Sequence, residues 1–170
     1  MSNRIIFIIG GARSGKSSFA LKEASKISGK KAYIATAEAL DGEMKIRIEK
    51  HRKDRGSKWD TYEEPLKISG IIEKIKDKYN VIVIDCLTLW LSNIMHRNKN
   101  IKSEIESFCS LLFAVNCSLF TVSNEVGMGI VPDNEMAREF RDLAGFLNQK
   151  IAEIADEVYV VTAGIPIKIK

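Results

Sequence analysis

A glycine-rich segment at residues 10–17 points most directly to chemistry. It reads Gly-Gly-Ala-Arg-Ser-Gly-Lys-Ser, the pattern G-x-x-x-x-G-K-S, and it lies between an apolar run at residues 5–9 and a predicted helix. In such a loop the backbone N–H groups surround the phosphates of a nucleoside triphosphate. The lysine reaches the β- and γ-phosphates, and the serine hydroxyl binds Mg²⁺. We predict that Lys16 is catalytic and that Ser17 is a ligand of Mg²⁺. The predicted nucleotide contacts of the loop are Gly10, Gly11, Ala12, Arg13, Ser14, Gly15, Lys16 and Ser17.

A carboxylate at the end of a second apolar run supports this interpretation. Residues 81–84 are Val-Ile-Val-Ile, and Asp85 follows them. Four β-branched apolar residues predict a buried strand of a parallel sheet. An aspartate at the tip of such a strand, beside a phosphate-binding loop, orients Mg²⁺ or its water ligands. An aspartate in an ordinary turn is the alternative, and we predict the metal role for Asp85.

A basic segment at residues 43–55 contains one histidine. In a helix Arg47, His51 and Arg55 would follow one face, because their spacing is four residues. Three more cations surround this histidine: Lys50, Arg52 and Lys53. A solvated basic helix with an incidental histidine is one interpretation. The other is a nucleophile, because nearby cations attract polyphosphate and disfavour protonation of an imidazole, which keeps a lone pair available.

Strands and helices alternate along the rest of the chain, which predicts an α/β fold with a mainly parallel central sheet. The predicted strands are residues 5–9, 31–36, 81–85, 118–123 and 157–163, with 164–170 as an edge strand. The predicted helices are residues 17–28, 43–55, 66–78, 86–95, 101–115 and 135–154. Residues 56–65 are predicted as a loop in which Glu63 is a candidate hydrogen-bond partner of a base or ribose, with simple exposure to solvent as the alternative. Because ligands gather at the carboxyl ends of parallel strands, Ala35, Thr36 and Ala37 are candidate nucleotide contacts.

Length and composition limit the classes of protein to consider. The 170 residues predict one domain, residues 1–170. No apolar run reaches the roughly 20 residues of a membrane span, and the first apolar run is too short for a signal peptide. Three cysteines without a C-x-x-C pair indicate free thiols in the cytoplasm. A net charge of +4 suits anionic substrates and does not require nucleic acid as a partner.

Blocks of residues along almost the whole chain resemble one family, the bifunctional adenosylcobinamide kinase / adenosylcobinamide-phosphate guanylyltransferases of cobalamin assembly. The most specific block is residues 123–132, Ser-Asn-Glu-Val-Gly-Met-Gly-Ile-Val-Pro. The other blocks are residues 10–17, 33–36, 41–51, 59–63, 85–93, 138–149 and 163–166.

The resemblance implies a P-loop NTPase fold, namely a RecA-like three-layer sandwich. It also implies two reactions: phosphorylation of adenosylcobinamide by ATP or GTP, then transfer of GMP from GTP to adenosylcobinamide phosphate. His51 matches the histidine that carries GMP in the family, and the assembly is expected to be a homotrimer. The nucleotide contacts implied outside the loop at residues 10–17 are Ala35, Thr36, Ala37, Arg52, Lys53, Asp54, Arg55, Glu63 and Asp85.

Two departures and two alternatives remain open at this point. Many members of the family have a second histidine where this chain has Lys50, and a proline where it has Gly56. The main alternative is a P-loop kinase of another small metabolite, in which His51 is a bystander and no covalent adduct forms. The second alternative is a nucleotide switch or a nucleic-acid-binding ATPase. Binding of single-stranded nucleic acid would need basic residues interspersed with aromatic residues, and the sequence lacks such a segment.

Overall fold

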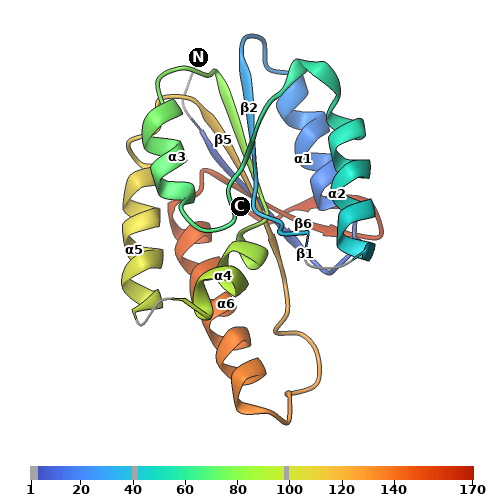
Figure 1. The fold of residues 1–170 in the computed structure, drawn as a ribbon, viewed down its shortest axis with the longest axis vertical. Coiled ribbons are helices and arrows are strands. Elements are labelled where there is room, and N and C mark those ends of the chain that lie inside the picture. Colours follow the sequence, from blue (N-terminus) through green and yellow to red (C-terminus); the bar gives the residue numbers. More distant parts are fainter. Residues whose placement is uncertain (1–3, 40–41, 98–99) are drawn as a thin grey trace.

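A computed structural model describes residues 4–39, 42–97 and 100–170, and within the helix at residues 42–55 it leaves the side chains of Glu43, Arg47 and Asp54 undescribed. These residues form a seven-stranded sheet with helices on both faces (Figure 1). The strands are β1 Ile5–Gly10, β2 Lys31–Ala35, β3 Asp60–Glu63, β4 Val81–Asp85, β5 Ser118–Asn124, β6 Glu157–Thr162 and β7 Ile165–Lys168. The helices are α1 Lys16–Ser25, α2 Gly42–Arg55, the short 3₁₀ helix η1 Gly56–Lys58, α3 Ile68–Ile75, α4 Leu87–Met95, α5 Ile101–Leu112 and α6 Glu135–Ile154.

The strand order is β3-β2-β4-β5-β1-β6-β7, and only β7 runs antiparallel to its neighbour. The mainly parallel sheet expected from the alternating pattern is therefore confirmed. The first and last strands along the chain lie near one edge, while β4 and β5 separate β1 from β2. Because β1, β4 and β2 run parallel, their carboxyl ends lie at the same end of the sheet.

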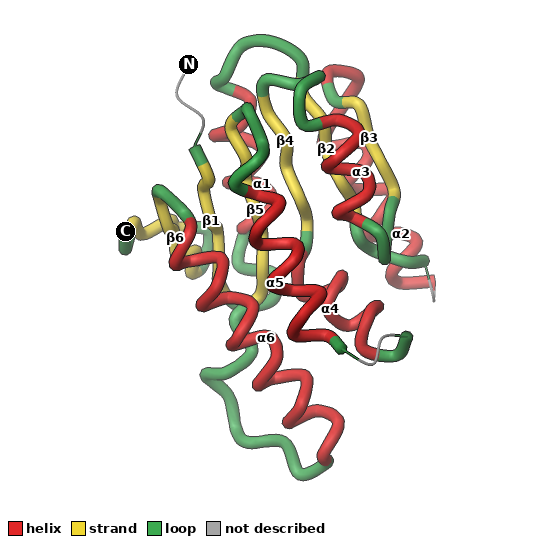
Figure 2. Tube along the Cα trace, turned by 90° about the vertical axis from the view of Figure 1, so that its left-hand side faces the viewer, coloured by secondary structure: helices red, strands yellow, loops and turns green. Residues whose placement is uncertain are grey.

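Two hydrophobic layers hold this sheet between the helices. Along β1, Phe7 packs toward α3, α4, α5 and α6, whereas Ile6 and Ile8 pack toward α1. Figure 2 shows α4, α5 and α6 in front of the sheet, and Figure 1 shows α1 and α2 on the opposite side from α3 and α5. Consecutive residues of a strand point to opposite faces, so a run of apolar residues supplies both layers.

The structure differs from the sequence prediction at β3 and at the end of α1. Residues 60–63 were expected in a loop, but they pair in parallel with β2 as an edge strand. Helix α1 ends at Ser25 rather than at residue 28, because Lys26 and Ile27 make shorter-range bonds to the carbonyls of Glu23 and Ala24. Helices α3 and α5 are also shorter than predicted.

Two further features concern the surface of the molecule. The loop between β5 and α6 extends beyond the end of the sheet (Figure 1), and its Met128 and Ile130 are 89% and 97% exposed. Within the described part of the chain, no helix is both long and apolar enough to cross a bilayer.

Candidate active site

The glycine-rich segment forms a tight loop between β1 and α1. Arg13 and Gly15 have positive φ angles of 57° and 98°, and α1 begins at Lys16 directly after Gly15. Lys16 is buried, and its Nζ donates to the carbonyl oxygen of Gly11 at 2.6 Å. Ser14 Oγ is buried and has no hydrogen-bond partner among the described residues. A loop that precedes a helix N-terminus and retains an unbonded polar atom suits a bound phosphate.

The turn between β6 and β7 packs against the phosphate loop. Gly164 N–H donates to the carbonyl oxygen of Ser14 at 2.8 Å. A side chain on Gly10 would collide with the carbonyl oxygen of Val161 in β6, and a side chain on Gly15 would come within 3.2 Å of Gly164 Cα. The first and last glycines of the motif are therefore required by close backbone approach as well as by conformation.

Asp85 lies at the carboxyl end of β4, where its Oδ2 accepts a hydrogen bond of 2.6 Å from the Tyr33 hydroxyl. Burial, together with the nearby charge of Asp85, raises the pKa of Tyr33 well above its usual value, so the phenol remains a donor. The next residue is Cys86, whose thiol has its pKa raised to about 11 by burial. A neutral thiol is a weak nucleophile at neutral pH, which leaves His51 as the stronger candidate.

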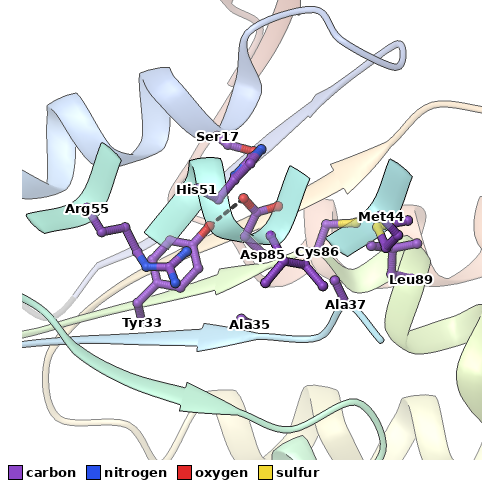
Figure 3. Close-up of a pocket in the computed structure, with 11 residues that line it drawn as sticks. Ser17, Tyr33, Ala35, Ala37, Met44, His51, Arg55, Asp85, Cys86 and Leu89 are labelled. Carbon is purple, nitrogen blue, oxygen red and sulfur yellow. Dashed lines mark hydrogen bonds between the residues drawn. The ribbon is translucent and has the colours of Figure 1, made fainter. Parts of the chain in front are cut away.

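Helix α2 brings His51 to the same cavity as the phosphate loop. A cavity of about 540 Å³ is lined by residues 13–17 of the loop, by Lys50 and His51, by Asp85 and Cys86, and by Asn124. A narrower cavity of about 50 Å³ adjoins it, and His51, Ser17, Asp85 and Cys86 border both. Figure 3 shows this narrower cavity, in which His51 and Arg55 of α2 lie opposite Tyr33 and Asp85 of the sheet.

The arrangement of oxygen ligands fits Mg²⁺. Ser17 and Asp85 border the same two cavities beside the phosphate loop. No group of three or more His, Cys, Asp or Glu residues that could hold a metal occurs in residues 4–39, 42–97 and 100–170. Mg²⁺ does not need such a cage, because it is usually bound by one or two protein ligands, water and the phosphates of the substrate.

The other residues that the sequence singled out have different surroundings. Ala35 and Ala37 line the narrower cavity with Arg55. Thr36 is fully buried behind it, and its Oγ1 bonds the backbone N–H and C=O of Cys86.

The remaining predicted contacts lie along α2 and β3. Arg52 and Glu63 form an ion pair with each other, and Lys53 is exposed outside both cavities. The Asp54 side chain, like that of Arg47, lies outside the described part of the structure.

Three residues at the site carried no sequence prediction of function. Tyr33 bonds Asp85, Cys86 lines both cavities, and Asn124 lines the larger cavity from the end of β5. For Asn124 the available signal was its position directly after a predicted strand, whereas the position of Tyr33 within its strand gave none.

The comparison with known proteins agrees with the geometry. Residues 6–169 match the family model described as cobinamide kinase / cobinamide phosphate guanyltransferase. The bifunctional adenosylcobalamin biosynthesis protein CobP of Pseudomonas aeruginosa is 40% identical over 165 residues, which are 96% of this chain and 95% of that protein. The corresponding CobU protein of Escherichia coli is 36% identical over an alignment 184 positions long, gaps included, which covers 98% of this chain and 99% of that protein.

Solved structures support the fold. A KaiC-like protein from Pyrococcus horikoshii superposes with a TM-score of 0.52 at 14% identity, over 92% of this chain and 70% of that chain. The RadB recombinase gives a TM-score of 0.55 at 15% identity, over 92% and 73%. At this level of identity the likeness concerns the fold alone, and it confirms the RecA-like P-loop architecture.

Proposed function

Because this chain belongs to the cobinamide kinase / cobinamide phosphate guanyltransferase family, we propose that His51 is the residue that carries GMP between the two substrates. The observation that carries this proposal is the position of His51. It borders the same cavity as Lys16 and Ser17 of the phosphate loop, although it comes from a separate element of the fold. A triphosphate bound by the loop would therefore extend toward the imidazole.

In the guanylyl transfer, an unprotonated ring nitrogen of His51 attacks the α-phosphorus of GTP. A P–N bond forms, the P–O bond to the β-phosphate breaks, and pyrophosphate leaves with the bonding electron pair. The imidazole then releases its remaining ring proton to solvent. A phosphate oxygen of adenosylcobinamide phosphate attacks the same phosphorus, and the P–N bond breaks. The imidazole leaves with the bonding pair, takes back a proton from solvent, and adenosylcobinamide-GDP is formed. Two displacements through a covalent intermediate replace one difficult step.

In the kinase reaction, the hydroxyl of the aminopropanol arm of adenosylcobinamide attacks the γ-phosphorus of ATP or GTP. The bond from this phosphorus to the β–γ bridging oxygen breaks, ADP or GDP leaves with the electron pair, and the hydroxyl proton passes to solvent. Lys16 and the loop amides bind the phosphoryl oxygens and stabilise the negative charge that develops on them. Mg²⁺ held by Ser17 and Asp85 would neutralise further charge on the phosphates. The same loop serves both reactions, so the two differ in which phosphorus is presented to the attacking group.

The test is incubation with GTP labelled at the α-phosphate and Mg²⁺, followed by denaturation and intact-mass measurement. We expect a GMP adduct that is labile in acid and stable in alkali, as phosphoramidates are. The chain has two histidines, so His96 provides a matched control. His96 follows the end of α4 and lines neither cavity. We expect no adduct in His51→Asn and an unchanged adduct in His96→Asn.

Absence of an adduct in the wild-type protein would refute the covalent mechanism. Phosphorylation of adenosylcobinamide by the same preparation would then favour a P-loop kinase in which His51 has no catalytic role. Loss of the adduct in both histidine variants would also contradict the assignment to His51.

We propose in addition that the chain assembles as a homotrimer, as the family resemblance implies, and that it works in the cytoplasm. Apolar side chains exposed around the loop between β5 and α6 support assembly: Met128, Ile130, Val131 and Met136. Three free, buried cysteines suit a reducing compartment. Light scattering on the wild-type protein tests the first point, and a monomer at micromolar concentration would contradict it. Cell fractionation tests the second.

A further inference from the structure

Helix α2 is held to the body of the protein in an unusual way. Most of its described residues are exposed, and among them Arg55 at the last position is the only one that is buried, at 7% exposure. Met44, Ile48 and His51 are partly buried. Helices in proteins are usually fixed by an apolar face. In α2 the inward face holds Met44, Ile48 and His51 together with the buried guanidinium of Arg55, so a cation contributes to the attachment.

The partner of Arg55 is the ring of Tyr33 in β2. The Arg55 Cζ lies 4.2 Å from the centroid of that ring (Figure 3). Its Nε is buried and has no hydrogen-bond partner in the described part of the chain. A guanidinium stacked on an aromatic face is attracted by the ring quadrupole, and the attraction is stronger when both groups are removed from water. Tyr33 is 2% exposed, so this condition is met.

The other end of Tyr33 touches the predicted magnesium ligand. Its hydroxyl donates to Asp85 Oδ2 at 2.6 Å, which fixes the orientation of the carboxylate in β4. Trp59 lies edge-on to the Tyr33 ring, with centroids 6.2 Å apart, and limits its movement. One side chain therefore contacts the helix that carries His51 and the carboxylate opposite it.

We propose that Tyr33 is a positioning residue that joins the two halves of the site. Its ring sets the position of α2, and thus of His51, through Arg55. Its hydroxyl sets the orientation of Asp85 toward the metal. The first role rests on the function proposed for His51, whereas the second depends only on Asp85 binding Mg²⁺ with the nucleotide. The two roles can be separated because the ring and the hydroxyl can be removed one at a time.

The hydroxyl is tested with Tyr33→Phe, which keeps the ring under Arg55. The readout is the affinity for a non-hydrolysable GTP analogue, measured by calorimetry with and without Mg²⁺. Partners that hydrogen-bond a metal-binding carboxylate change metal affinity about 10- to 100-fold, so we expect at least a tenfold loss of the gain that Mg²⁺ gives. The affinity without Mg²⁺ should not change. Tyr62→Phe is the control, since the Tyr62 hydroxyl bonds Tyr79, away from both cavities.

The ring is tested with Tyr33→Leu, in comparison with Tyr33→Phe. The readouts are the single-turnover rate of GMP–His51 formation and the rate of adenosylcobinamide phosphorylation. Misplacement of a reacting group by about 1 Å can cost 100-fold in rate, so we expect a loss of guanylylation at least tenfold larger than the loss of phosphorylation. Phosphorylation does not use His51. Tyr33→Phe should restore the ratio of the two rates to that of the wild type.

A double-mutant cycle decides whether Tyr33 acts through Arg55. If it does, Arg55→Met combined with Tyr33→Leu should lose no more guanylylation than Arg55→Met combined with Tyr33→Phe, since both double variants lack the hydroxyl and differ only in the ring. Multiplication of the two losses would overturn this coupling, and so would an equal loss of both reactions in Tyr33→Leu. An unchanged Mg²⁺ effect in Tyr33→Phe would overturn the role of the hydroxyl.

The wild-type protein separates a failure of this inference from a failure of the proposed function. If it forms no GMP adduct, the proposed function fails and the role of the ring falls with it. The Mg²⁺ measurement on Tyr33→Phe still decides the role of the hydroxyl. If the wild type forms the adduct, but Tyr33→Phe keeps the full Mg²⁺ effect and Tyr33→Leu loses both reactions equally, the proposed function stands and the inference about Tyr33 is wrong.

Discussion

Replacing Thr36 with valine should destabilise the protein far more than the similar shapes of the two side chains suggest. Thr36 Oγ1 donates to the carbonyl oxygen of Cys86 at 2.7 Å and accepts from the N–H of Cys86 at 2.8 Å. Both groups are in the buried interior, where valine offers neither a donor nor an acceptor. The carbonyl of Cys86 would still accept from Trp90 N–H at 3.1 Å, whereas the N–H of Cys86 would lose its partner.

The magnitude follows from these two losses. A buried N–H left without a partner costs about 1–3 kcal/mol, and the second lost bond costs about 0.5–1.5 kcal/mol. Thr36→Val leaves no cavity, because the two side chains have nearly the same volume. We therefore expect the free energy of unfolding to fall by about 2–4 kcal/mol. For a chain of this length the melting temperature should fall by roughly 4–16 °C.

Urea unfolding of Thr36→Val and Thr121→Val is the matched comparison. Thr121 is also fully buried, but its Oγ1 donates to the carbonyl oxygen of Ile6 at 3.5 Å, the limit of a hydrogen bond. We expect Thr121→Val to cost less than about 1 kcal/mol. Equal losses in the two variants, or a loss below about 1 kcal/mol for Thr36→Val, would refute the reasoning. Thr36→Ser, which keeps the hydroxyl, should recover most of the difference.

Two further predictions concern the loop and the sheet edge. Gly10→Ala should lower the free energy of unfolding by about 1–3 kcal/mol and weaken nucleotide binding, because the new Cβ collides with the carbonyl oxygen of Val161. Gly11→Ala is the control, since its Cβ meets nothing within 4 Å. Its free energy of unfolding, measured in urea, should stay near that of the wild type. The pKa of Glu157 is lowered in the folded state, first by the Tyr159 hydroxyl at 2.7 Å and then by two cations, so its stabilisation is present above about pH 4.3 and is lost as the pH falls through the folded-state pKa. Glu157→Gln should therefore be less stable than the wild type at pH 7, and the difference should shrink as the pH falls below about 4.3 in parallel urea titrations. A difference that does not change with pH would contradict the electrostatic explanation.

The sequence predicted best those elements whose signal is local. The strand at residues 81–85 and the helix at residues 135–154 have the predicted bounds, because a continuous apolar run and a long amphipathic pattern mark them clearly. The edge strand β3 was missed because Asp-Thr-Tyr-Glu has no apolar pattern and is mostly exposed. Its conformation depends on pairing with β2, which lies 25 or more residues earlier in the chain, and no local signal reports that pairing.

The same distinction applies to the site. The phosphate loop and Asp85 could be predicted, since each combines a strand with a specific residue at its end. Tyr33 could not, because its contact with Asp85 requires β2 and β4 to be neighbours, and chain order does not state this. Asn124 joins the cavity for a similar reason, since β5 lies between β4 and β1. The sequence does not show which residues of different strands face each other until the strand order is known.

The position of His51 distinguishes the two enzymatic interpretations more clearly than its sequence context does. A simple P-loop kinase needs a cation, a metal-binding carboxylate and a hydroxyl near the phosphates, and Lys16, Asp85 and Ser17 supply them without any imidazole. The helix that carries His51 directs Met44, Ile48, His51 and Arg55 toward the narrower cavity, and an apolar side chain at position 51 would pack on that face as well as an imidazole does. The structure nevertheless puts His51 where the two cavities meet. An imidazole at this position favours a nucleophile aimed at a bound triphosphate over a bystander, and the GMP-adduct measurement decides between them.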